Sequence, residues 1–122
     1  SECMPFPLPG TPVRGSKTGK PLMALLDLIG RAWSLGVIWN LYQKPLTFRL
    51  LQEKCEGISP TLLNTRLKEL RAAQLVEKSI HGYQLTPLGL SLFQLVEPMG
   101  AWSKHWQQTL IKNELTTLQG EQ

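Results

Sequence analysis

The sequence predicts a mainly α-helical (α+β) domain of the winged helix-turn-helix class, and three observations support that prediction. Apolar residues recur at helical spacing through most of residues 20–112. A short helix, a tight turn and a helix with a polar and basic face follow one another from Thr47 onward. Two short strands then meet at a turn containing His81 and Gly82, which makes a two-stranded β-hairpin wing. A C-terminal helix completes the predicted helical bundle.

Length and charge favour one domain with an anionic partner. The chain has 122 residues, 42% of them hydrophobic, which suffices for a single core. Its net charge is +4 and unevenly placed: residues 14–78 hold eleven Lys or Arg against five Asp or Glu, and residues 79–122 hold two against three. Positive charge therefore accompanies the predicted helix-turn-helix, as expected of a nucleic-acid-binding surface.

The two ends of the chain lack helical periodicity. Residues 1–19 contain four prolines and three glycines and are predicted to form an irregular arm. Residues 113–122 are predicted to be a polar, frayed tail, which leaves residues 20–112 as the folded domain. The chain lacks a signal-peptide pattern at its start and any apolar run of the ~18 residues that span a membrane. We therefore expect a cytoplasmic protein without membrane association.

Two amphipathic segments are predicted to form the first helices. The first begins at Pro21 and ends at Gly30. The second spans 32–43 and is broken by Lys44-Pro45. The apolar face of the first helix consists of Leu22, Leu25, Leu26 and Ile29, and that of the second of Trp33, Val37, Ile38 and Leu41.

A short third helix leads into the predicted recognition helix, residues 59–73. Thr47 can cap the third helix, which turns Phe48, Leu51 and Cys55 inward and ends at Gly57. Ser59 is a good N-cap for the recognition helix, and Pro60 suits its first position because no N–H is needed there. The buried stripe of this helix repeats at i, i+4 and i+7: Leu63, Leu67 and Leu70.

The other side of residues 59–73 carries the candidate DNA contacts. Asn64 can pair with adenine in bidentate fashion, and Arg66 or Lys68 can reach guanine or phosphate. Arg66 lies beside the apolar stripe, so pairing with Glu69 is an alternative for it. An ordinary solvated face is the other interpretation, but the turn, the hairpin and the charge distribution favour DNA. The candidate residues on this helix are Ser59, Thr61, Asn64, Thr65, Arg66, Lys68 and Arg71.

The hairpin and two more helical segments follow. Lys78 and His81 lie near the hairpin tip and are the wing's candidate DNA contacts. Thr86 can cap the next helix, whose first residue is Pro87, and Pro98 is expected to kink or break it. The predicted apolar stripe of that helix consists of Leu88, Leu92, Leu95, Val96 and Met99.

The last helical segment places Trp102, Trp106 and Leu110 on one face. A single small domain cannot fully cover a terminal helix, so an isologous dimer interface is expected to bury these residues. An alternative is a cavity between this helix and the first two, which would accept a flat apolar effector.

No pattern in the chain predicts catalysis or a metal site. There is no glycine-rich phosphate loop and no Ser/His/Asp arrangement on a strand–turn–helix. Neither the cysteines nor His105 have metal-ligand spacing. We therefore expect a protein that is not an enzyme and that uses no cofactor.

Six ordered motifs together resemble one family. They are L-D-L-I-G-R-A-W (26–33), L-T-F-R-L-L-Q (46–52), G-I-S-P-T-L-L-N-T-R-L-K-E-L (57–70), A-A-Q-L-V (72–76), Y-Q-L-T-P-L-G (83–89) and A-W (101–102). This set resembles the HxlR-type transcriptional regulators, winged-helix proteins related in architecture to MarR. The resemblance implies a prokaryotic homodimer that binds a roughly palindromic operator. It also implies a dimer interface built by the C-terminal helix and the first helix, including Leu22 and Leu25.

Two departures from the family pattern bear on mechanism. Many members carry Cys-Pro directly before the first helix, and that cysteine senses electrophiles or oxidants. Here the pair is Lys20-Pro21, and lysine has no thiol chemistry. Cys3 and Cys55 lie elsewhere, and Cys55 is expected to be a small buried apolar residue. The predicted wing is also short, so the recognition helix is expected to carry more of the DNA contact.

The predicted function is therefore sequence-specific binding of double-stranded DNA by a homodimeric, nucleoid-associated transcriptional regulator. Two alternatives remain. One is a winged-helix module that contacts another protein through its Leu and Trp surfaces. The other is a regulator that responds to a small aromatic ligand.

Overall fold

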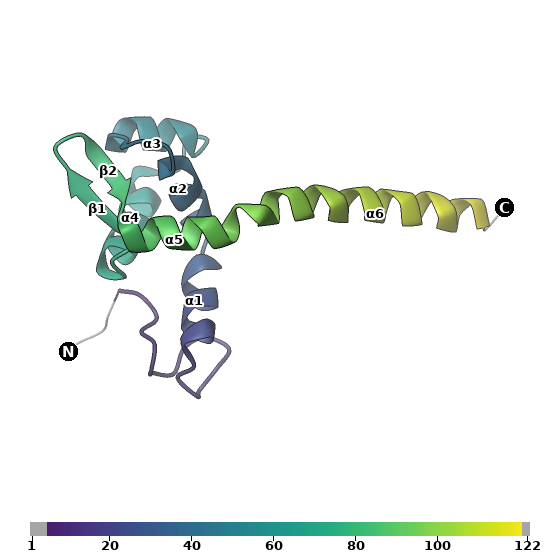
Figure 1. The fold of residues 1–122 in the computed structure, drawn as a ribbon, viewed down its shortest axis with the longest axis horizontal. Coiled ribbons are helices and arrows are strands. Elements are labelled where there is room, and N and C mark those ends of the chain that lie inside the picture. The colour runs from purple at the N-terminus through teal and green to yellow at the C-terminus, as the bar shows by residue number, and fades with distance from the viewer. Residues whose placement is uncertain (1–4, 121–122) are drawn as a thin grey trace.

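The computed structural model describes residues 5–120, apart from the side chains of residues 116–119. The elements follow the predicted order and form a winged helix-turn-helix, in which β1 and β2 pair antiparallel beside the helices (Figure 1). Residues 5–19 contain no helix and lie below α1 in this view. The elements are α1 (Pro21–Ile29), α2 (Ser34–Leu41), α3 (Phe48–Lys54), α4 (Pro60–Ala72), β1 (Val76–Ser79), β2 (Gly82–Leu85), α5 (Pro87–Val96) and α6 (Pro98–Gly120).

The core is centred on α2, which contacts α3, α4, α5 and the wing strand β2. The predicted stripe of α4 is buried, with Leu63, Leu67 and Leu70 at most 1% exposed. The predicted inward residues of α3 behave in the same way, because Leu51 and Cys55 are fully buried and Phe48 packs against the core. The helices α3 and α4 therefore each bury one face in the core and expose the opposite face to solvent.

Side-chain caps begin three helices where the sequence predicts them. The hydroxyl oxygens of Thr47, Ser59 and Thr86 accept hydrogen bonds from the backbone N–H groups three residues further on. Proline occupies the first turn of α4 and of α5, where its missing N–H costs nothing. These starts are local chemistry, which explains why they could be predicted.

The second helix is shorter than predicted, spanning Ser34–Leu41 rather than residues 32–43. Trp33 precedes it with a left-handed φ of 69°, so its backbone is not helical. Its ring lies so close to Gly36 that a Cβ there would be 2.6 Å from Trp33 Cε3. Packing of the indole over this glycine accompanies the unusual backbone, and helical periodicity alone could not show it.

The wing turn is displaced by one residue from the prediction. Ser79 pairs with Gly82, so Ile80 and His81 form the turn and Gly82 begins β2. Gly82 has a φ of 119°, and a Cβ on it would be 2.4 Å from the Leu46 carbonyl oxygen. The close approach arises because Leu46 and Tyr83 exchange backbone hydrogen bonds of 2.9 and 2.8 Å. The base of the wing is thereby fastened to the segment before α3.

The buried faces of α1 and α5 differ from the predicted ones. In α1 the buried apolar residues are Ala24 and Leu28, whereas Leu22 and Leu26 are exposed. In α5 the predicted Leu92 and Val96 are buried together with Phe93. Leu88, Leu95 and Met99 are exposed. Both helices carry apolar residues on the exposed side as well as on the buried side, so the spacing of apolar residues does not identify the inward face.

The C-terminal helix is longer than predicted and leaves the body of the protein. The chain breaks between α5 and α6 at Pro98, as expected, but α6 then continues to Gly120 instead of fraying from residue 113. In Figure 1 it extends α5 and runs away from the other elements. Within residues 5–120 no single helix is long and apolar enough to cross a membrane; α1 and α2 pass that test only as a pair, bent by 84°.

Candidate nucleic-acid interface

A tight turn sets the angle between α3 and α4. Glu56 and Gly57 both adopt positive φ, 56° and 73°, which reverses the chain within two residues. The Gln52 side chain donates to the Ile58 carbonyl at 2.9 Å, and Ile58 is buried directly before the Ser59 cap. The hydrogen bond from Gln52 and the burial of Ile58 thus stabilise the turn and set the direction in which α4 begins.

The outward face of α4 is polar and positive. Asn64, Lys68 and Arg71 are exposed, and none of their side chains has a hydrogen bond or ion pair to another described residue. Thr65 is exposed as well, but its hydroxyl donates to the Thr61 carbonyl at 3.0 Å. The structure therefore brings five of the predicted residues to one exposed face of α4, and Ser59 is exposed at the N-cap: Thr61, Asn64, Thr65, Lys68 and Arg71 share the face.

The end of α4 and the first wing strand share a basic hollow. Lys68 and Arg71 line it from α4, and Lys78 lines it from β1. The one acidic residue in its lining is Glu77, whose carboxylate accepts a 2.7 Å hydrogen bond from Gln84. Three cations around one hollow suit a phosphodiester backbone, which attracts Lys and Arg irrespective of sequence.

Apart from Lys78, the wing contributes one further candidate DNA contact, His81. His81 is exposed at the hairpin turn, and its backbone N–H donates to Ser79 Oγ at 3.1 Å. The Lys78 ammonium lies 5.6 Å from the centre of the Tyr83 ring, within cation–π distance. With strands of four residues each and a two-residue turn, the wing is short, as the sequence predicted.

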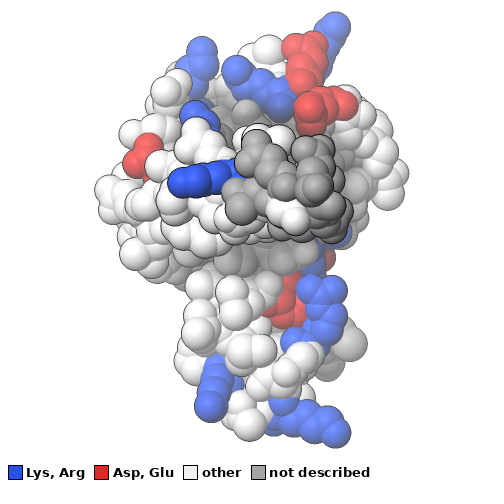
Figure 2. Space-filling model, turned by 90° about the vertical axis from the view of Figure 1, so that its right-hand side faces the viewer, with Lys and Arg blue, Asp and Glu red and all other residues white. Residues whose placement is uncertain are grey.

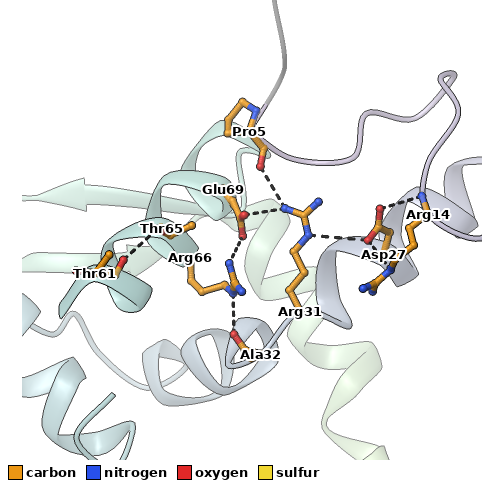
Figure 3. A network of polar contacts seen from close by, with 9 residues as sticks. All are labelled: Pro5, Arg14, Asp27, Arg31, Ala32, Thr61, Thr65, Arg66 and Glu69. Atoms are coloured by element: carbon orange, nitrogen blue, oxygen red, sulfur yellow. Dashed lines mark hydrogen bonds and ion pairs between the residues drawn. The ribbon is translucent and has the colours of Figure 1, made fainter. Parts of the chain in front are cut away.

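Arg66 is the exception among the predicted contacts. Its side chain is only 14% exposed and turns toward the body of the protein (Figure 3). The guanidinium donates to the Ala32 carbonyl at 2.7 Å and to Glu69 Oε1 at 3.1 Å. The alternative pairing considered from the sequence is therefore the one adopted, because Arg66 lies next to the buried stripe and a buried Glu69 needs a cation.

Arg66 belongs to a larger network that sequence reasoning missed. Arg31 pairs with Glu69 at 2.7 Å and with Asp27 at 3.9 Å, and Arg14 pairs with Asp27 at 3.4 Å. Both acidic residues are buried. A signal was available, because Asp27 interrupts the apolar segment L-M-A-L-L-D-L-I-G and a buried carboxylate requires partners. Its partners lie far away in sequence, which the pattern could not show.

A second surface, on α6, is apolar and uncovered. Trp102, Trp106 and Leu110 are 62, 53 and 52% exposed, and the two indole rings stack with centroids 6.0 Å apart. Leu22 of α1 is also exposed, at 62%, whereas Leu25 packs partly against the core of its own chain. Exposed tryptophans at helical spacing are unusual on a monomer.

Charge and hollows elsewhere are less specific. In the view along α6, Lys and Arg side chains lie on both the upper and the lower part of the molecule (Figure 2). An apolar hollow lies between the end of α2, the wing base and α5, lined among others by Tyr42, Leu85 and Leu90. Another is formed by α6 itself, around Trp106 and Leu110. Neither lies between α6 and the first two helices, where the sequence suggested an effector cavity.

A fixed helix with an exposed polar and basic face, entered by a tight turn and followed by a β-hairpin, defines a winged helix-turn-helix DNA-binding protein. Comparison with known proteins narrows the class. The HxlR-like helix-turn-helix family model matches residues 28–110, and the chain belongs to that family. It is a transcriptional regulator with a helix-turn-helix DNA-binding domain, as the sequence predicted.

Relatives agree with this assignment. The transcriptional regulator YodB of Bacillus subtilis is 31% identical over 84 residues, which cover 63% of this chain and 75% of YodB. YybR of the same organism, an uncharacterized transcriptional regulator, is 26% identical over 96 residues, covering 73% of this chain and 77% of YybR. Both relatives are described as transcriptional regulators of the helix-turn-helix type.

Solved structures show the same fold. Quinone-bound YodB superposes with a TM-score of 0.64 at 31% identity, covering 69% of this chain and 96% of YodB. A MarR-family transcriptional regulator from Enterococcus faecalis superposes with a TM-score of 0.66, covering 82% of this chain and 97% of that one. At 21% identity, the second likeness concerns the fold alone.

Proposed function

We propose that this protein acts as a homodimer that binds an operator in double-stranded DNA and thereby occludes or organises a promoter. The observation that supports this most directly is the outward face of α4, where Asn64, Lys68 and Arg71 have no partner among the described residues. Each α4 of the dimer enters a major groove, and successive grooves on one face of DNA lie about 34 Å apart.

In this proposal one residue of α4 contacts a base, and the basic residues of α4 and β1 contact the phosphate backbone of the DNA. Asn64 lies mid-face on α4 and reads a base edge, for which the Asn–adenine pair is the usual geometry. Lys68, Arg71 and Lys78 contact phosphates around the basic hollow. Thr61 and Ser59 add contacts near the start of the helix.

The first test is DNA affinity. The operator is selected from random oligonucleotides, and binding is followed by fluorescence anisotropy at two salt concentrations. We expect Lys68→Ala to weaken binding about tenfold on all sequences and to lower the salt slope by about two, because each subunit of the dimer loses one phosphate contact. Asn64→Ala should instead weaken binding by a similar factor and relax the preference at one base position.

Lys104→Ala is the matched control, because it removes the same charge from α6, outside the α4–wing surface. DNA binding that shows no sequence preference, or that is no tighter than millimolar, would contradict the proposal and favour the protein-contact alternative. An unchanged affinity in Lys68→Ala would remove α4 from the interface.

A response to a small aromatic effector is a second candidate, favoured by the solved structure of quinone-bound YodB. In this chain Lys20 precedes Pro21, and Cys55 is fully buried. Burial raises the pKa of the Cys55 thiol, so the thiolate that would attack a quinone is scarce. We therefore propose that an effector binds without a covalent bond to Cys55.

This candidate is tested with the Cys3→Ser variant. Cys3 lies outside the described residues, and replacing it leaves Cys55 as the one cysteine of the sequence, so any adduct on a thiol is assigned to Cys55. A benzoquinone should quench tryptophan fluorescence and weaken operator binding, while the mass of the native protein stays unchanged. Denaturation should then allow Cys55 to react. A quinone adduct on Cys55 in the folded protein would contradict the expectation.

A further inference from the structure

The buried ion-pair network connects three parts of the chain through one residue, Arg31 (Figure 3). Arg31 lies between α1 and α2. Its Nη1 donates to Glu69 of α4 at 2.7 Å and to the Pro5 carbonyl of the arm at 3.2 Å. Its Nε lies 3.9 Å from Asp27 of α1. The arm itself is seated, because Pro7 is buried and Phe6 packs against the core.

The network matters because α1 and α4 otherwise share little direct packing within the described residues. Glu69 is only 7% exposed and accepts from Arg31 and Arg66, one cation on each carboxylate oxygen. Arg66 also donates to the Ala32 carbonyl at 2.7 Å. The α1–α2 connection therefore holds α4 through two directional polar contacts, one from Arg31 to Glu69 and one from Arg66 to the Ala32 carbonyl.

Directional contacts fix an orientation more narrowly than apolar packing does, because hydrogen bonds weaken steeply as their angle departs from linearity. A bidentate or forked guanidinium adds geometric specificity. In a dimer built by α1 and α6, the orientation of α4 relative to α1 sets the separation of the two recognition helices. That separation must match the spacing of the operator half-sites.

We propose that Arg31 is a positioning residue for DNA recognition: by linking Glu69 to Asp27 and to the arm, it sets the angle at which α4 is presented. This inference rests on the proposed function for its consequence at the operator. Its structural part does not need DNA. Arg31 is not proposed as a DNA contact itself, because its side chain is only 25% exposed and its Nη1 donates to Glu69 and to the Pro5 carbonyl inside the protein.

The structural part is tested by a distance within one chain. Spin labels are placed at Lys20→Cys and Asn64→Cys in a Cys3→Ser background, where buried Cys55 stays unlabelled. Labelled chains are diluted with unlabelled ones so that only the intramolecular distance is measured. The parent should give one narrow distance. Arg31→Met should broaden or shift it, whereas Arg49→Met, which breaks an exposed ion pair on α3, should not.

The functional part uses unlabelled protein and palindromes whose half-site spacing is varied one base pair at a time. The parent should prefer one spacing, and Arg31→Met should reduce that preference about tenfold with its melting temperature near that of the parent. Should Arg31→Met fold poorly, Arg31→Met/Glu69→Met removes both partners of the 2.7 Å ion pair together, so that no buried Glu69 is left with Arg66 as its one cation.

The outcomes separate the two proposals. An unchanged label distance in both Arg31 variants overturns the inference, whatever the protein does with DNA. A changed distance with unchanged spacing preference overturns its functional half. If the parent binds no DNA specifically, the proposed function fails, while the distance measurement still decides whether Arg31 positions α4.

Discussion

Arg66 and Lys68 are two positions apart on α4, and their side chains point in opposite directions, one into the protein and one toward solvent. Lys68 is exposed beside the basic hollow, whereas Arg66 is held against the Ala32 carbonyl and Glu69. Two residues correspond to about 200° around a helix, so neighbouring basic residues cannot share one face. A count of positive charge on a recognition helix therefore overstates the charge that DNA meets, and only position relative to the buried stripe separates the two kinds.

Glycine at position 82 is required for two reasons, a positive φ and a backbone neighbour. In Gly82→Ala the new Cβ would be 2.4 Å from the Leu46 carbonyl, so the wing must move. Gly57 shares the positive φ, but a Cβ there meets nothing within 4 Å. We expect Gly57→Ala to lower the free energy of unfolding by about 1 kcal/mol and Gly82→Ala by about 2–4 kcal/mol, measured by urea denaturation. Equal losses would contradict the close contact.

At the scale of the element, helix starts could be predicted and inward faces could not. Capping is a local matter of a hydroxyl and an N–H three residues away, so Thr47, Ser59 and Thr86 could be assigned from the sequence. The faces of α1 and α5 depend on which neighbours cover them, because both helices carry apolar residues on their exposed sides as well. The buried network was missed for the same reason, since Glu69 and Arg31 are 38 residues apart.

The caps differ in how much each one holds. Thr47 Oγ1 accepts one hydrogen bond, whereas the Thr86 hydroxyl accepts from Gly89 and also donates to the Gln74 carbonyl at 2.7 Å. Thr86 thus joins the start of α5 to the segment after α4. We expect Thr47→Ala to cost about 1 kcal/mol and Thr86→Ala about 2 kcal/mol in the free energy of unfolding. A smaller loss for Thr86→Ala than for Thr47→Ala would show that the second bond contributes nothing.

At the scale of the whole molecule, the part of the chain that the structure describes leaves the tryptophan face of α6 more than half exposed. We expect a dimer in sedimentation equilibrium and a monomer for Trp106→Glu, because a carboxylate cannot be buried unpaired in an apolar interface. Losing the dimer should weaken operator binding by at least about a hundredfold, since the two heads then bind independently.

Gln108→Glu is the matched control for that variant. Two residues on from Trp106, its side chain lies on the opposite side of α6 and adds the same charge. It should remain dimeric and bind DNA like the parent. A dimeric Trp106→Glu protein would show that the exposed tryptophans serve another purpose.

The unsupported length of α6 has a consequence for how such a regulator responds to its own abundance. A helix without tertiary packing is marginal in water, so in the proposed dimer α6 and the interface would form together. At low concentration a newly made chain would then lack both a stable α6 and a partner, and would bind one half-site weakly. Occupancy of the operator would rise with roughly the square of the chain concentration, which converts a gradual rise in synthesis into a threshold.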